Sequence, residues 1–129
     1  MSQANSKVAV VDDCPMFFDF IKQKINKHIG NIEFVYFTDP DSFLDHLSKK
    51  PTDFSFLIVD RYIKSYDIFN DDFVQTCKTL GYEGAISLVS SAPPASQDEK
   101  DQNERFDYVL AKSRSDMIFK LIDMIKNYL

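Results

Sequence analysis

Short apolar runs rich in β-branched residues alternate along this chain with longer stretches in which apolar residues recur at helical spacing. Such runs are typical of strands buried on both faces, and the longer stretches are typical of amphipathic helices. Gly30 and Gly81 follow two of the helical stretches and act as stop signals. The pattern predicts strands at residues 7–11, 32–37, 54–59, 85–89 and 108–111, and helices at residues 15–29, from 39 or 40 onward, 70–80, 95–105 and from 113 onward.

This alternation predicts an α/β domain, with a doubly wound five-stranded parallel sheet and helices on both faces. Right-handed crossovers leave few arrangements of such a sheet, and the flavodoxin-like strand order 2-1-3-4-5 fits five strands. In that order the first and third strands are neighbours where the winding direction changes, and ligands bind there at the carboxyl ends of the strands. A length of 129 residues fits one domain, so we expect residues 1–129 to fold as a single unit.

Composition and charge exclude several classes of function. The formal net charge of −5 argues against direct nucleic-acid binding, because phosphate backbones require clustered Lys and Arg. No apolar run approaches the roughly 20 residues that span a bilayer, and the first residues lack the apolar stretch of a secretory signal. Cys14 and Cys77 lie far apart and outside any CxxC pattern, as expected of reduced thiols. We therefore expect a cytoplasmic protein that binds neither a membrane nor nucleic acid.

Chemically active side chains follow the predicted strands at their carboxyl ends. Because parallel strands bring these ends to one edge of the sheet, we expect the side chains to converge there. Taken singly, each has an ordinary explanation, such as a helix cap, a turn residue or a solvated lysine. Their joint placement at four strand ends favours a functional site. The residues are Asp12 and Asp13 after the first strand, Asp60 after the third, Ser90 after the fourth and Lys112 after the fifth.

The chemistry of this set follows from its charges. Three neighbouring carboxylates repel one another and require a cation, and ligand sets made only of oxygen select a hard divalent ion such as Mg²⁺. A metal ion and an ammonium together neutralise a phosphoryl group during its transfer, and a carboxylate can act as the nucleophile toward it. The hydroxyl of Ser90 can donate a hydrogen bond to a phosphoryl oxygen.

The segments VAVVDD, FLIVD, LVSSA and YVLAK, which contain these residues, resemble the four motifs of the receiver domain of bacterial two-component response regulators, the CheY-like family. No single motif is specific, but the ordered set is. The spacings from Asp60 to Ser90 and from Ser90 to Lys112 are also typical of that family. The resemblance covers essentially the whole chain, so residues 1–129 are expected to form a single receiver domain.

The resemblance implies a signalling role. Asp60 is similar to the aspartate that takes a phosphoryl group from a phosphohistidine on a histidine kinase or a histidine phosphotransfer protein, with Mg²⁺ bound. The protein would then assist its own phosphorylation and dephosphorylation rather than act as an enzyme on other substrates. The implied Mg²⁺ ligands are the side chains of Asp12, Asp13 and Asp60 and the backbone carbonyl of Tyr62.

The resemblance also implies a switch and an output surface. Ser90 is similar to the hydroxyl residue that responds to phosphorylation, and Lys112 to the lysine that pairs with the phosphoryl group. A downstream protein partner is expected to bind the face near residues 91–129. Within that face, residues 95–105 offer almost no apolar anchor, so we expect this segment to reorganise on phosphorylation or docking.

The sequence departs from the family pattern at several positions. Lys64 stands where the family usually has proline four residues after the phosphoacceptor, the following loop is altered, and Ser113 replaces the proline that usually follows the lysine. The usual aromatic switch position holds Val109, and Tyr108 is one residue away. Because side chains alternate along a strand, Tyr108 is expected to face the other way, which places the usual coupling of the hydroxyl and aromatic residues in doubt.

Alternative functions stay open at this stage. A pseudo-receiver would keep the fold as an interaction module without being phosphorylated, and the altered loop after Asp60 favours it. A Mg²⁺-dependent phosphatase with an aspartyl nucleophile usually needs a second acid/base carboxylate and a cap over its site. A flavin or dinucleotide carrier is disfavoured, because the chain has no GxGxxG motif and Asp12 and Asp13 would repel a phosphate.

Overall fold

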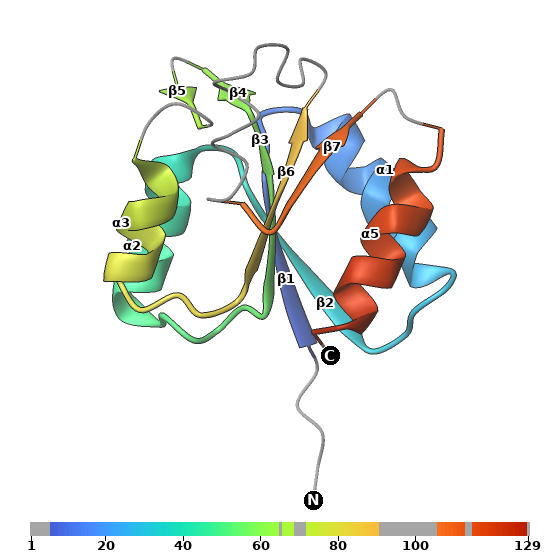
Figure 1. Ribbon diagram of the computed structural model, residues 1–129, viewed down its shortest axis with the longest axis horizontal. Coiled ribbons are helices and arrows are strands. Elements are labelled where there is room, and N and C mark those ends of the chain that lie inside the picture. Colours follow the sequence, from blue (N-terminus) through green and yellow to red (C-terminus); the bar gives the residue numbers. More distant parts are fainter. Residues whose placement is uncertain (1–5, 65, 69–71, 91–105, 113–114, 129) are drawn as a thin grey trace, which may run out of the picture.

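A five-stranded parallel sheet forms the centre of the computed structural model, which describes residues 6–64, 66–68, 72–90, 106–112 and 115–128 (Figure 1). Its strand order is β2-β1-β3-β6-β7, the predicted flavodoxin-like order. A short antiparallel hairpin, β4–β5, stands apart from the sheet. The strands are β1 (Ser6–Val11), β2 (Ile32–Phe37), β3 (Phe56–Asp60), β4 (Tyr62–Ile63), β5 (Tyr66–Asp67), β6 (Ala85–Ser90) and β7 (Tyr108–Ala111); the helices are α1 (Pro15–Asn26), α2 (Pro40–Lys49), α3 (Phe73–Thr79) and α5 (Met117–Lys126).

The predicted fold class is confirmed, with differences at the ends of elements. The third strand begins at Phe56 rather than at residue 54, α1 ends at Asn26 rather than at residue 29, and α3 begins at Phe73 rather than at residue 70. The predicted helix at residues 95–105 lies outside the described residues, as does the predicted helix start at residue 113. The described part of the last helix begins at Met117.

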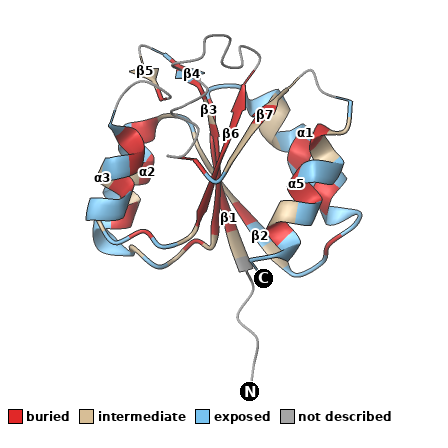
Figure 2. Ribbon diagram, viewed as in Figure 1, coloured by how far each residue is buried: buried red, intermediate tan, exposed pale blue. Residues whose placement is uncertain are grey.

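Two hydrophobic layers cover the two faces of the sheet (Figure 2). Side chains along β3 alternate between them, so that Leu57 and Val59 face one layer whereas Phe56 and Ile58 face the other. The α2/α3-side cluster includes Val11, Phe43, Leu47, Leu57, Val59, Val74, Cys77 and Leu88, and the α1/α5-side cluster includes Val10, Ile21, Ile25, Phe56, Ile58, Leu121 and Ile125. Burial on both faces explains the continuous apolar character of the strands.

Helices α1 and α2 begin at the rim where the strands have their carboxyl ends, and each has a proline in its first turn. Beside the start of each helix, an aspartate accepts a hydrogen bond from a backbone N–H. Just before α1 the carboxylate of Asp12 accepts a hydrogen bond from the backbone N–H of the N-cap residue Cys14 at 2.9 Å. In α2 the N-cap Asp39 accepts one from the Ser42 backbone N–H at 2.8 Å, and this bond lowers the pKa of Asp39. The expected start of α2 at residue 39 or 40 is therefore confirmed.

The β4–β5 hairpin was not predicted. Its apolar anchor is Ile63, which is fully buried in the α2/α3-side cluster together with Ile68 just beyond β5. The nearly buried Arg61 closes the hairpin, because its Nε donates to Asp67 Oδ1 at 3.2 Å. Lys64, in the turn, has a left-handed φ of 56°. The hairpin is thus fixed by tertiary contacts directly after the strand that carries Asp60.

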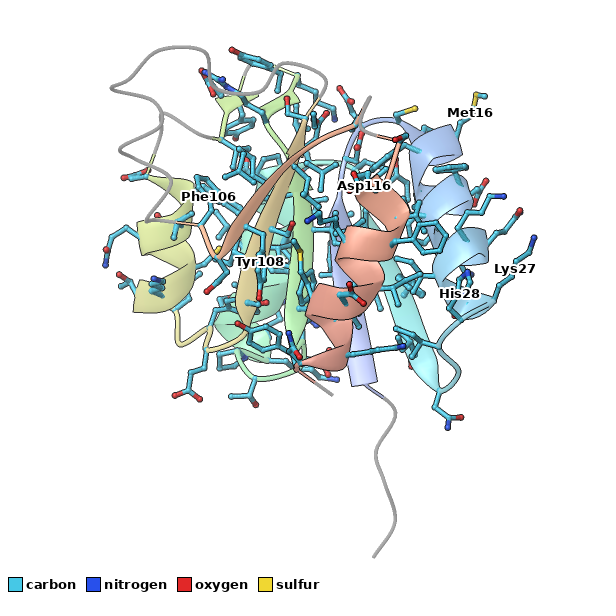
Figure 3. All side chains as sticks on the ribbon, turned by 45° about the vertical axis from the view of Figure 1, so that its right-hand side comes forward. Met16, Lys27, His28, Phe106, Tyr108 and Asp116 are labelled. Carbon is cyan, nitrogen blue, oxygen red and sulfur yellow. The ribbon has the colours of Figure 1, made fainter. Side chains whose placement is uncertain are left out.

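Met16, Lys27 and His28 project outward from the α1 side of the molecule (Figure 3), and all three are exposed. Among the described residues, no helix is both long enough and apolar enough to cross a membrane.

Candidate functional site

Three carboxylates meet where the strands end. Asp12 and Asp13 follow β1, and Asp60 is the last residue of β3, the neighbour of β1 in the sheet. One oxygen from each of the three side chains lies within 4.8 Å of the others. Asp12 is buried, Asp60 is half-buried and Asp13 is exposed. The edge of the sheet therefore holds an acidic pocket, which we define as Asp12, Asp13 and Asp60, open to solvent on the Asp13 side.

Lys112 brings a positive charge into this acidic pocket from the end of β7. Its Nζ donates to Asp12 Oδ2 at 2.9 Å and lies 3.5 Å from Asp60 Oδ2. The same ammonium lies 4.1 Å from the centroid of the Phe17 ring in the first turn of α1. The sheet thus places a lysine and the central aspartate within contact distance, although β7 and β3 are not adjacent strands.

The carboxylate of Asp60 is in an unfavourable environment for a charge. Burial raises its pKa to about 6, and the negative charge of Asp12 adds to the increase. The charge of Lys112 and the hydrogen bond from the Arg61 N–H to Asp60 Oδ1, at 2.9 Å, act in the opposite direction without cancelling it. The acidic pocket therefore carries more negative charge than its own ammonium neutralises.

Asp13 and Tyr62 lie at the solvent side of the acidic pocket. Asp13 Oδ2 accepts a hydrogen bond of 3.4 Å from the Lys64 backbone N–H in the hairpin turn. Tyr62 is the first residue of β4, and 47% of it is exposed. The guanidinium carbon of Arg61 lies 4.8 Å from the centroid of the Tyr62 ring. That the backbone carbonyl of Tyr62 is a metal ligand stays a prediction.

Ser90 is the last residue of β6, the neighbour of β3 on the side away from β1. Val89 pairs with Asp60 in the register of these two strands, so Ser90 lies one position beyond the level of Asp60. Ser90 is buried, and its backbone carbonyl accepts a hydrogen bond from the Lys112 N–H at 2.8 Å. The predicted site residues of β6 and β7 are thus linked through the backbone.

The prediction about Tyr108 is confirmed. Tyr108 packs against the α1/α5-side cluster, whereas Val109 packs against the α2/α3-side cluster. Phe106, just before the strand, is buried in the α2/α3-side cluster (Figure 3). The side of β7 that faces the α2/α3 layer therefore presents Val109 rather than an aromatic residue near Ser90.

Two neighbours of the acidic pocket were not identified from sequence. Phe17 was not singled out among the apolar residues of the predicted helix at residues 15–29, and its place in the first turn of that helix, just after Asp13, was the available signal. Arg61 gave no signal, because an arginine after a strand is usually solvated. In the structure Arg61 is buried and forms an ion pair with Asp67 of the hairpin.

The donor set fits a hard divalent cation. The three carboxylates offer oxygen ligands within one ion's reach, which suits Mg²⁺. Burial and the charge of Asp12 raise the pKa of Asp60, and a bound cation would favour its ionised form. Asp12, Asp13 and Asp60 are therefore the residues that would hold Mg²⁺.

Comparison with known proteins agrees with this geometry at the level of the fold. No protein-family model matches the sequence, and no curated protein matches it. Among solved structures, the chain is similar to a CheY-like response regulator receiver domain from Methylobacillus flagellatus, with a TM-score of 0.74 and 16% identity over 96% of this chain and 98% of that chain.

Two further structures give the same result. Chemotaxis protein CheY4 from Vibrio cholerae aligns with a TM-score of 0.74 and 18% identity over 98% of this chain and 100% of that chain. Response regulator TrrA from Thermotoga maritima, solved in complex with Mg²⁺-BeF, aligns with a TM-score of 0.72 and 16% identity over 96% of this chain and 99% of that chain. The chain has the fold of the CheY-like receiver domains.

Proposed function

We propose that this protein is a phosphoaccepting receiver module of a two-component or phosphorelay system. Asp60 takes a phosphoryl group from a phosphohistidine on a histidine kinase or a histidine phosphotransfer protein, with Mg²⁺ bound, and the change alters the binding of a downstream protein. The observation that carries the proposal is the convergence of three carboxylates and the Lys112 ammonium at the strand ends of a receiver fold.

Asp60 acts as the nucleophile in this reaction. One oxygen of its ionised carboxylate attacks the phosphorus atom, a phosphorus–oxygen bond forms, and the phosphorus–nitrogen bond of the donor breaks with its electron pair left on the imidazole nitrogen. With a pKa of about 6, Asp60 is mostly ionised at neutral pH. Because the nucleophile is a carboxylate, it needs no proton removed before it attacks.

The other residues stabilise charge. Asp12, Asp13 and Asp60, with the Tyr62 carbonyl, would hold Mg²⁺, which would supply a positive charge for the phosphoryl oxygens. Lys112 already lies 3.5 Å from Asp60 Oδ2 and can shift its ammonium onto a phosphoryl oxygen. The Ser90 hydroxyl donates to another phosphoryl oxygen, and the face near residues 91–129 transmits the change to the downstream partner.

Phosphorylation by a small donor tests the proposal. Incubation with acetyl phosphate and Mg²⁺ is expected to add one phosphoryl group, read by intact mass, and chelation of Mg²⁺ is expected to abolish the addition. Asp60→Asn should remain unmodified. Asp53→Asn is a matched control, because Asp53 precedes β3 at the opposite edge of the sheet. A mass increase that persists in Asp60→Asn contradicts the assignment.

One observation favours a second candidate, an interaction module that is never phosphorylated. The acidic pocket already has internal donors, because the Lys64 N–H contacts Asp13 and Lys112 contacts Asp12. If the protein is such an interaction module, neither acetyl phosphate nor a phosphohistidine donor increases its mass at any Mg²⁺ concentration. Sustained release of phosphate from an added phosphomonoester would instead support the aspartyl-nucleophile phosphatase.

A further inference from the structure

We propose that Phe17 is a positioning residue that holds the Lys112 ammonium over the acidic pocket through the face of its ring. The inference rests on the proposed function, because it concerns the same site. It assigns a role to an aromatic side chain that neither binds the metal nor reacts.

The Lys112 ammonium lies close to three groups. Nζ lies 2.9 Å from Asp12 Oδ2, 3.5 Å from Asp60 Oδ2 and 4.1 Å from the Phe17 ring centroid. A cation within about 6 Å of a ring centroid is attracted by the negative face of the ring. Phe17 is therefore a third attractive partner of the ammonium, beside the carboxylates of Asp12 and Asp60.

The position of the Phe17 ring is fixed by the fold. Phe17 lies in the first turn of α1 and packs, half-buried, against the α1/α5-side cluster. Cys14, the N-cap residue of α1, donates its backbone N–H to Asp12 and so ties the start of the helix to this carboxylate. One residue, Asp12, thus both anchors the helix that carries the ring and accepts the ammonium that the ring holds.

A ring face suits this task better than a further carboxylate would. It attracts the ammonium without a directional hydrogen bond, so the three N–H donors of Lys112 stay available for oxygen atoms. It also adds no negative charge to a pocket that already holds three carboxylates. Without the ring, the flexible four-carbon side chain of Lys112 would sample more positions and would be less well placed for a phosphoryl oxygen.

The rate of phosphorylation by acetyl phosphate tests the role. Phe17→Leu is expected to lower the rate constant by roughly three- to tenfold, the range that a cation–π contact of moderate burial corresponds to. Phe17→Tyr, which keeps the ring face, should retain the rate. Phe18→Leu is the matched control, because Phe18 lies next on α1, is also half-buried against the same cluster and stacks on Tyr36 instead.

A double-mutant cycle separates positioning from packing. Phe17→Leu and Lys112→Met are combined, and the free energy of unfolding is measured for all four proteins by urea denaturation. Non-additive changes support the contact, and additive changes overturn the inference. It is also overturned if Phe17→Leu is phosphorylated at the wild-type rate, if Phe17→Tyr is as slow as Phe17→Leu, or if Phe18→Leu slows the reaction equally.

The two proposals fail in different ways. A wild-type protein that acetyl phosphate never modifies overturns the proposed function and, with it, this role of Phe17. A wild-type protein that is modified while Phe17→Leu behaves like wild type overturns the role of Phe17 alone.

Discussion

Asp60 is the residue in which the proposed function and stability oppose each other most directly. Its side chain is only 12% exposed, and the neighbouring carboxylate of Asp12, just after β1, is buried. Burial and the charge of Asp12 raise the pKa of Asp60 from an ordinary 3.8 to about 6, despite Lys112. In the metal-free protein an ionised Asp60 therefore destabilises the fold. The same unfavourable environment for a negative charge favours the binding of a cation.

Asp60→Asn is expected to stabilise the metal-free protein at neutral pH. Because the folded-state pKa lies above the ordinary value, the folded protein binds the extra proton between about pH 4 and 6, and wild-type stability falls as the pH rises through that window. Allowing for solvent screening, the mutant should gain about 1–2 kcal/mol at pH 7. Urea denaturation in a chelator at pH 4 and pH 7 measures the difference.

The pH dependence is the decisive part of that measurement. Most of the stability gained by the mutant should disappear at pH 4, where folded Asp60 is protonated and the unfolded chain, with its ordinary pKa of 3.8, is already partly protonated at this residue. A gain of equal size at both pH values would mean that the asparagine packs better, and that charge is not the cause.

At the scale of elements, Asp53 ties three segments together at the edge of the sheet opposite the acidic pocket. It precedes β3 and accepts hydrogen bonds from Lys7 of β1 at 3.0 Å and from the Nε2 side of His46 of α2 at 2.8 Å. Burial alone would raise the pKa of Asp53, but the bonds to His46 and Lys7 and the charge of Lys7 outweigh it and lower that pKa.

Asp53→Asn is therefore expected to destabilise the protein at neutral pH, the opposite of Asp60→Asn. The loss should be about 1 kcal/mol, because the pair is partly solvated. With a folded-state pKa below 3.8, the contribution of Asp53 is complete above that pH and is lost as the pH falls through the lowered value. Thermal unfolding at pH 7 and pH 2.5 should show the difference between mutant and wild type only at pH 7.

The strands were predictable because their apolar runs indicate burial on both faces of the sheet. A buried residue, however, is not always paired with a neighbouring strand. Phe54 is buried in the α2/α3-side cluster and was therefore included in the third strand. The pairing of β3 begins only at Phe56, opposite Val8 of β1. The error of two residues arises because an apolar side chain can reach the core from the connection before a strand.

The β4–β5 hairpin escaped prediction for a different reason. Each of its strands has two residues, too few for any periodicity. What holds it are contacts with the rest of the fold, including the Tyr66 hydroxyl, which donates to Asp41 Oδ2 of α2 at 2.6 Å. Such contacts join residues that are distant in sequence, and local pattern contains no information about them.

The polar members of the site were predictable because one rule, the convergence of parallel strand ends, places them. The place of the Phe17 ring depends instead on where α1 begins and on the distance between α1 and the end of β7. Both are set by packing in the α1/α5-side cluster, so the contact with Lys112 became visible only in three dimensions.

At the scale of the whole molecule, metal binding and folding should be linked. Mg²⁺ that binds only the folded acidic pocket stabilises the fold by about 2.7 kcal/mol when its free concentration is about 100 times the Kd. Asp13→Asn should abolish most of this stabilisation while changing the metal-free stability little, because Asp13 is exposed. Thermal unfolding at increasing Mg²⁺ concentration measures both quantities.

The control for this measurement is Asp123→Asn on the outer surface of α5, where the aspartate is also exposed. Its response to Mg²⁺ should match that of the wild-type protein. An equal loss of Mg²⁺ response in both variants would indicate a general effect of surface charge rather than a site at Asp13.

The direction of the strands has a practical consequence for handling the protein. β1 begins at Ser6, and α5 ends at Lys126, at the edge of the sheet opposite the acidic pocket (Figure 1). A polypeptide, dye or solid support attached at either end would therefore leave the mouth of the acidic pocket uncovered. An immobilised layer of this protein would present Asp13 to the solution, ready for a phosphodonor that arrives from the bulk.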